Sequence, residues 1–147
     1  GGRGIKGLQV IDAGRMLAGN PEYIVFNGRV GAVSKDRLVL HQGEKVRVYV
    51  GNGGVNLISS FHLIGEIFDK VYPEAQMGGS LFQNVQTTLV PSGGAAIVEF
   101  TADIPGTYVL VDHALARLDK GAWGTISVEG EKRADIFDGV TGAGTGH

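Results

Sequence analysis

The chain contains 147 residues, of which 43% are hydrophobic and 19% are charged. This length suits one domain with a sizeable core, and the apolar content excludes an intrinsically disordered chain. The formal net charge of −2 argues against a nucleic-acid partner. No apolar run approaches the roughly eighteen residues that cross a membrane as a helix.

Short apolar runs separated by turn signals follow one another along the chain. Its 25 glycines are about 17% of the residues, against a usual value of about 7%. Residues 8–19 predict a short helix or an irregular linker, and Asn27-Gly28 predicts a turn. The expected strands are residues 23–26, 45–50, 57–64, 84–90, 95–101, 108–113 and 125–129, and one short helix is expected at 114–120.

These elements predict an all-β fold, a Greek-key β-sandwich of antiparallel strands with one or two short helices. We expect a lead-in segment at residues 1–19, the sandwich at 20–130 and a tail at 131–147, disordered from Val140 onward. Residues 96–98 and 108–111 are apolar on both faces of their strands, so both faces need a cover. A partner subunit could provide the second cover, and so could a loop or a terminal segment.

Cysteine is absent and there are four histidines, which limits the metal chemistry of this chain. The lack of cysteine excludes disulfides, thiolate zinc sites, iron–sulfur clusters and a blue-copper centre built on this chain alone. His41 precedes a strand in a turn and is expected in solvent, and His147 at the chain end carries no assigned role. For His62 and His113, composition alone favours buried, hydrogen-bonded side chains. A hydrolytic pair of His62 with Glu66 or Asp69 is less favoured than a solvated face.

The closing part of the sequence resembles a cupredoxin. Residues 106–113, GTYVLVDH, followed by 121–124, GAWG, reproduce the order of a cupredoxin ligand strand and its return. The resemblance places the three type 1 copper ligands of a blue-copper domain at Asp112, near Leu115 and at Ala122, and none of these residues is a cysteine, histidine or methionine. It therefore implies a cupredoxin domain without its own type 1 copper.

Four further blocks narrow the resemblance to the second domain of copper-containing nitrite reductases. They are residues 21–28, 60–65, 84–91 and 110–113, within a similarity that covers about residues 20–137. Residues 50–54 and 65–72 are most similar to the lipoprotein-type, Neisseria-like branch of that family.

The nitrite reductase resemblance implies a role for each of five residues. Family members are trimers whose type 2 copper is held between subunits by three histidines, and the second-domain ligand falls on His113. The resemblance assigns proton relay to His62 and shaping of the nitrite pocket to Ile64, and it places partners of that histidine at Gln86 and Thr87. Strand alternation agrees, because it directs His113 away from the core if Tyr108 and its face-mates point inward.

The rest of the enzyme implied by the resemblance lies outside this sequence. It comprises an N-terminal cupredoxin domain with type 1 copper, a homotrimeric assembly, an electron-donor protein and nitrite as the substrate reduced to nitric oxide, in the periplasm or cell envelope. The chain is accordingly expected to be inactive alone, as an excised domain, a proteolytic product or half of a split enzyme. A non-enzymatic cupredoxin-like structural or assembly module is the alternative. A multicopper oxidase domain serving a trinuclear cluster ranks last, because no H-x-H pair is present.

Overall fold

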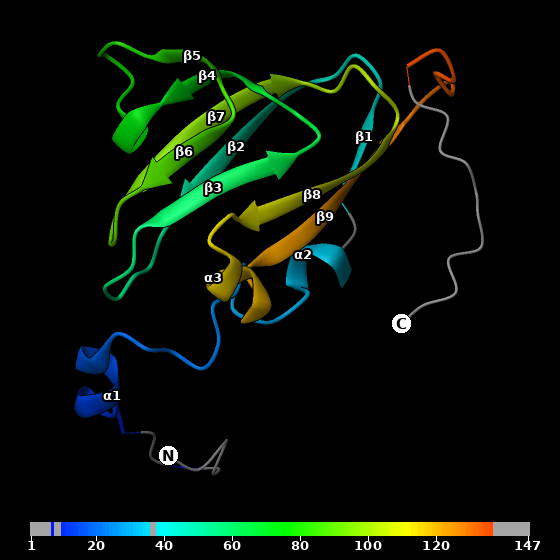
Figure 1. Ribbon diagram of the computed structural model, residues 1–147. Coiled ribbons are helices and arrows are strands. Elements are labelled where there is room, and N and C mark those ends of the chain that lie inside the picture. Colours follow the sequence, from blue (N-terminus) through cyan, green and yellow to red (C-terminus); the bar gives the residue numbers. More distant parts are fainter. Residues whose placement is uncertain (1–6, 8–9, 36–37, 137–147) are drawn as a thin grey trace, which may run out of the picture.

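Two β-sheets pack face to face in a computed structural model that describes residues 7, 10–35 and 38–136 (Figure 1). One sheet has five strands in the order β1-β9-β8-β3-β6, and the other has four in the order β2-β7-β4-β5. The strands are β1 (Leu38–His41), β2 (Lys45–Gly51), β3 (Ser59–Ile64), β4 (Phe68–Tyr72), β5 (Phe82–Val85), β6 (Thr87–Val90), β7 (Ala95–Thr101), β8 (Gly106–Asp112) and β9 (Trp123–Glu129). The predicted all-β sandwich is confirmed.

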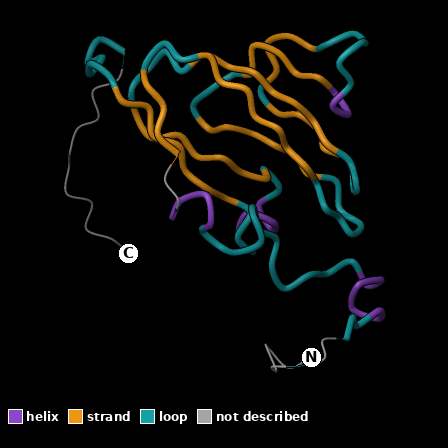
Figure 2. Tube along the Cα trace, turned by 180° about the vertical axis from the view of Figure 1, so that it is seen from behind, coloured by secondary structure: helices purple, strands orange, loops and turns teal. Residues whose placement is uncertain are grey.

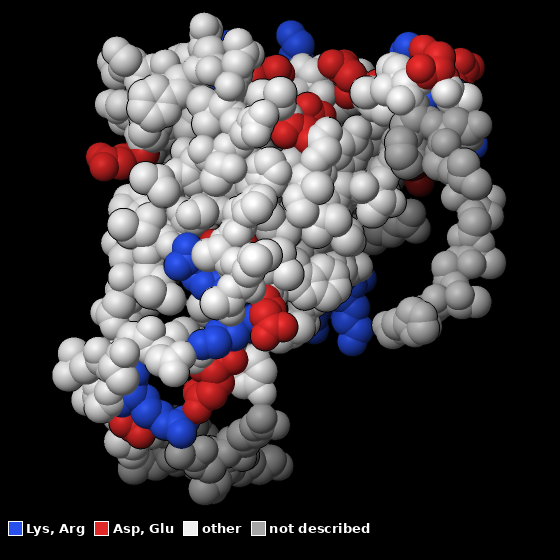
Figure 3. All heavy atoms as spheres, in the orientation of Figure 1, with Lys and Arg blue, Asp and Glu red and all other residues white. Residues whose placement is uncertain are grey.

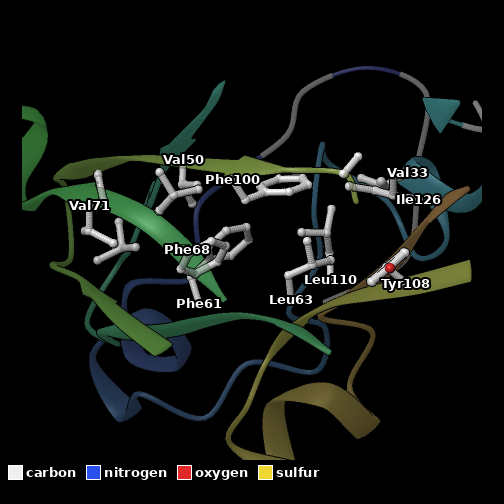
Figure 4. Close-up of a cluster of buried hydrophobic side chains, with 14 of the residues drawn as sticks. Val33, Val50, Phe61, Leu63, Phe68, Val71, Phe100, Tyr108, Leu110 and Ile126 are labelled. Carbon is white, nitrogen blue, oxygen red and sulfur yellow. The ribbon is translucent and has the colours of Figure 1, made fainter. Parts of the chain in front are cut away.

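The core lies between the sheets and is filled by the side chains that point inward from alternate residues of the strands (Figure 4). Phe61 of β3 and Phe68 of β4 belong to opposite sheets, and their rings stack with centroids 5.8 Å apart. Leu63, two residues after Phe61, has no exposed surface. Residues 61 and 63 therefore face the core, which directs 62 and 64 to the outer face of the five-stranded sheet.

Two of the short helices lie at one end of the sandwich, one lies before it, and a 3₁₀ turn directly follows β4 (Figures 1 and 2). They are α1 (Ala13–Ala18), α2 (Ala32–Lys35), the 3₁₀ turn η1 (Pro73–Ala75) and α3 (Leu115–Asp119). The expected helices in residues 8–19 and 114–120 are thus present. Helix α1 begins where the Asp12 side chain accepts the Arg15 backbone N–H, and ends at Gly19, whose φ of 66° is left-handed.

Four predictions about the strands are corrected. The single strand expected at residues 84–90 is two strands, β5 and β6, which belong to different sheets. Residues 23–26 form no strand: Ile24 donates one backbone hydrogen bond to Lys120, and Phe26 packs edge-on against Phe61, so this segment covers the end of the core. Strands β1 and β4 were not expected. β1 runs parallel to β9, so the sandwich is not wholly antiparallel.

The strands that are apolar on both faces, β7 and β8, are covered largely by side chains of the adjacent strands in their own sheets. Ile97 points outward from β7 but is only 5% exposed, and its cross-strand neighbours are Tyr49 and Tyr72. Val111 of β8 has no exposed surface between His62 and Trp123 on the flanking strands. Large cross-strand side chains can provide this cover, so a partner subunit is not needed to explain it.

Some predicted features fall beyond the described residues. The tail from Val140 and His147 lie outside them, so their expected disorder and lack of a role stay predictions. Within the described ranges, no helix combines the length and apolar character needed to cross a membrane.

Candidate functional site: two histidines on the outer face

Strands β3 and β8 are antiparallel neighbours, and they bring His62 and His113 together. In their register His62 lies opposite Val111. His113 follows the last residue of β8 and continues the ladder, since its backbone N–H donates to the Ser60 carbonyl at 2.9 Å. The two imidazole rings have centroids 5.2 Å apart and planes inclined by 62°. Residues 51 positions apart in sequence therefore form one pair.

His113 projects into solvent from the outer face of the five-stranded sheet, as strand alternation predicts. The interpretation of His113 as a buried histidine is wrong. Tyr108 and Leu110, on the opposite face of β8, belong to the core. The imidazole of His113 makes no hydrogen bond with any other described residue, and its recorded contact is the ring of His62.

His62 is half-buried and held in one orientation by the segment before β6. Its Nδ1 lies 2.6 Å from the Gln86 carbonyl oxygen and 3.4 Å from Thr87 Oγ1. A carbonyl oxygen can only accept, so Nδ1 carries the proton and Nε2 keeps its lone pair. Both residues assigned as partners of His62 thus contact it. Gln86 does so through its backbone, which no choice of side chain removes.

Ile64 lies on the same face of β3 as His62 and is 44% exposed. The outward positions of β3, β6 and β8 carry no Asp, Glu, Lys or Arg, and Figure 3 shows mainly uncharged side chains over β3 and β8. Other large apolar side chains exposed on this outer face are Leu89 and Trp123. The histidine pair therefore sits in an uncharged, partly apolar surface.

Neither carboxylate near His62 in sequence pairs with it. Glu66 accepts a hydrogen bond from the Ile67 backbone at 2.9 Å, and Asp69 accepts one from the Thr101 hydroxyl at 3.0 Å. Burial raises the pKa of Glu66, and the nearby Asp103 and Asp69 charges add to this effect against the Ile67 hydrogen bond. The less favoured interpretation, a hydrolytic pair of His62 with Glu66 or Asp69, is therefore wrong.

His41 is a surface residue, as expected. It is exposed at the end of β1, and its Nδ1 lies 3.4 Å from Glu44 Oε1. The His41 backbone N–H donates to Glu44 and, as the main cause, lowers the pKa of that carboxyl. This histidine takes no part in the pair.

A buried ion pair that the sequence did not reveal anchors the strand end before His113. Asp112 is 3% exposed, and its carboxylate accepts from Arg117 Nε at 2.8 Å, Ser59 Oγ at 3.0 Å and the Ala114 backbone N–H at 3.2 Å. These partners belong to α3, β3 and the turn between β8 and α3. A single aspartate at a strand end carries no sequence signal that distinguishes this role from a turn residue.

A cavity lined by described residues lies elsewhere in the fold. Its volume is about 350 Å³, and it separates residues 15–26 from the 51–57 loop. Asp112 and Ala122 line it, but neither histidine of the pair does. Asp112 and Ala122 stand where the resemblance places type 1 copper ligands in a blue-copper domain. The cavity therefore borders those positions, whereas the histidine pair lies on the exposed face of the sheet.

The donor set of the pair fits copper, but only as part of a site. Imidazole nitrogen suits copper, zinc and nickel. Across the described ranges, no group of three or more His, Cys, Asp or Glu side chains is arranged to hold a metal ion. A closed copper site therefore needs ligands from outside the described residues.

Comparison with known proteins gives one consistent family. The multicopper oxidase family model matches residues 6–132. Copper-containing nitrite reductases of Neisseria meningitidis serogroup A and Neisseria gonorrhoeae are 57% and 56% identical to this chain over 140 residues. Those matches cover 93% of this chain but only 36% and 35% of the relatives. The chain thus spans about a third of their length.

Solved structures agree with the sequence relatives. A copper nitrite reductase from Nitrosomonas europaea superposes with a TM-score of 0.72 at 30% identity, covering 83% of this chain and 45% of that one. A second, from Thermus scotoductus, gives 0.69 at 30% identity and covers 73% and 25%. The chain belongs to the multicopper oxidase family, as a cupredoxin-like domain homologous to part of the copper-containing nitrite reductases of Neisseria.

Proposed function

We propose that this chain is the second cupredoxin domain of a copper nitrite reductase, and that it contributes one type 2 copper ligand and one proton-transferring histidine at a subunit seam. The observation that carries the proposal is the His62–His113 pair, with ring centroids 5.2 Å apart on an exposed, uncharged sheet face. The homology to Neisseria copper nitrite reductases supports the same reaction class.

His113 is the proposed ligand because its imidazole is exposed and makes no hydrogen bond to another described residue. When bound, type 2 copper supplies the coordination position for nitrite and the single electron that its reduction to nitric oxide requires. Two histidines from the first domain of a neighbouring subunit complete the site in this proposal. The Asp112 anchor holds the β8 end and therefore limits where His113 can point.

His62 is the proposed proton carrier. The Gln86 carbonyl holds its Nδ1–H, so Nε2 is the atom that can take up and deliver a proton. Gln86 and Thr87 position this ring. Ile64, two residues along the same face, narrows the space above the ligand site and keeps it apolar.

The outer face is the proposed seam between subunits. Leu89 is 65% exposed there, and Ile64 and Trp123 are partly exposed, so docking another domain buries apolar surface. We accordingly propose a homotrimer with an N-terminal domain that carries type 1 copper, an electron-donor protein, and a location in the periplasm or cell envelope. Alone, the 147-residue chain lacks the remaining ligands and is expected to be inactive.

A chimera tests the proposal directly. This chain replaces the homologous third of the Neisseria meningitidis reductase, and copper content, the type 2 electron paramagnetic resonance signal and nitrite-dependent nitric oxide formation are measured. His113→Ala should abolish the type 2 signal and activity while type 1 copper and the trimer remain, and His41→Ala should change neither. Full type 2 copper in the His113→Ala chimera would refute the ligand role. A chimera that folds with type 1 copper but never forms type 2 copper would favour the non-enzymatic module.

A further inference from the structure

His62 and His113 lie at nearly the separation expected when two imidazoles bind the same metal ion. With metal–nitrogen bonds of about 2.0–2.1 Å, two imidazoles have ring centroids about 5 Å apart on a tetrahedral ion and about 4.5 Å apart in adjacent positions of a tetragonal copper(II) ion. The observed separation of His62 and His113 is 5.2 Å. This spacing is built into the fold, because the two residues stand on hydrogen-bonded neighbouring strands.

The nitrogen atoms needed for such a site make no hydrogen bond to another described residue. The Nδ1–H of His62 is taken by the Gln86 carbonyl, which leaves its Nε2 lone pair available. Metal-binding histidines commonly donate their second ring N–H to a carbonyl in this way, which fixes the tautomer and the ring direction. The His113 ring makes no hydrogen bond to another described residue.

We propose that His62 and His113 of a single chain form a two-histidine site for a divalent first-row transition ion, with copper(II) bound most tightly and water in the remaining positions. The order of affinities follows from the imidazole donors, which bind Cu²⁺ more strongly than Ni²⁺ or Zn²⁺. No carboxylate of the described residues contacts either ring, so the ligand set is neutral. The absence of cysteine leaves no thiolate to compete for the ion.

This site goes beyond the proposed function, in which His62 stays unligated and carries protons. It belongs to the chain before a partner contributes its own ligands. The arrival of those ligands would free His62 for proton transfer. The two proposals give His113 the same role as a ligand but give His62 different roles, so they can fail separately.

The test titrates the 147-residue chain with copper(II) sulfate. Isothermal calorimetry gives the affinity, and electron spin-echo modulation counts the coordinated imidazoles. The double variant His62→Gln/His113→Gln defines background binding, and His41→Gln is the matched control. Circular dichroism and urea unfolding of each variant establish that the sandwich is intact.

The expected result is one copper above background with two imidazoles in the wild type and in His41→Gln. Each single variant, His62→Gln or His113→Gln, should lose one imidazole and bind copper at least tenfold more weakly. Wild-type affinity in His62→Gln would overturn the two-histidine site and leave the ligand role of His113 intact. Wild-type affinity in His113→Gln would overturn it as well. If His62→Gln unfolds, His62→Ala and paramagnetic broadening of both imidazole proton signals in the wild type decide the question, and broadening of one ring alone overturns it.

Discussion

Asp112 and His113 are consecutive residues whose side chains leave the end of β8 on opposite faces of the sheet. The Asp112 carboxylate is buried and bonded to Ser59, Ala114 and Arg117, whereas the His113 imidazole projects into solvent beside His62. A rigid polar anchor thus directly precedes the exposed ring. The position of His113 depends on buried interactions on the other side of its own strand.

Arg117→Met should destabilise the chain by about 3–5 kcal/mol, because it leaves the buried Asp112 carboxylate without its cation. Urea unfolding followed by circular dichroism measures this loss. Arg133→Met is the matched control, since its ion pair with Asp135 is exposed to solvent and adds little to stability. Equal losses in the two variants would show that the Asp112 pair adds nothing beyond a surface contact.

His62→Ala in the nitrite reductase chimera should lower turnover by about 10²–10⁴-fold, the usual range for losing a general acid–base group. Type 2 copper should stay bound, because the assembled site takes its ligands from His113 and the partner. Steady-state nitric oxide formation and copper content are measured together, with His41→Ala as the control. Loss of the copper, or unchanged turnover, would contradict the proton-carrying role.

Gly121→Ala should destabilise the sandwich by at least about 1 kcal/mol. Its φ is +112°, and a Cβ there would lie 2.8 Å from Val30 Cγ2 and 3.2 Å from the Ile24 carbonyl oxygen. Gly78→Ala is the comparison, because a Cβ at that position meets nothing within 4 Å. Thermal unfolding of both variants measures the difference. A melting temperature unchanged by Gly121→Ala would mean that residues 24–30 do not hold the described position.

Glu66→Gln should stabilise the chain near neutral pH. Burial raises the pKa of Glu66 above 4.5 in the folded state, so the folded chain binds this proton more tightly than the unfolded chain does. The ionised carboxyl therefore lowers the free energy of unfolding as the pH rises through and above 4.5. The glutamine side chain still accepts the Ile67 N–H and carries no charge.

Urea midpoints from pH 3 to pH 7 test this dependence. The advantage of Glu66→Gln over the wild type should vanish at the acidic end. Asp135→Asn should behave with the opposite sign, because the Arg133 hydrogen bond lowers the pKa of Asp135 in the folded state. A constant difference between Glu66→Gln and wild type at all pH values would show that ionisation is not the cause.

Local patterns in the sequence predicted those strands that bury only one of their two faces. β2 alternates cleanly, so its pattern of period two identified it as a strand. β4 was missed because its fully buried residues, Phe68 and Val71, are three apart, which breaks that period. Residues 23–26 are apolar because they cover the end of the core, and apolar content alone cannot distinguish such a cover from a strand.

The histidine pair was only partly predictable. Alternation placed His113 outside and put His62 and Ile64 on one face, but the distance between His62 and His113 depends on strand pairing between distant segments. The contact from Gln86 comes from its backbone carbonyl, which side-chain identity does not report. The anchoring role of Asp112 was likewise hidden, because it depends on which partners the fold brings to a buried carboxylate.

The position of β9 between β1 and β8 also constrains the order in which this chain can fold. β1 ends at His41 and pairs with residues 126–129, so its strand partner among the described residues is β9, the last of their strands in chain order. The four-stranded sheet, complete by Thr101, can assemble earlier on the ribosome. The five-stranded sheet stays open until translation passes Glu129, and during that interval the edges of β1 and β8 are exposed to pairing with other chains.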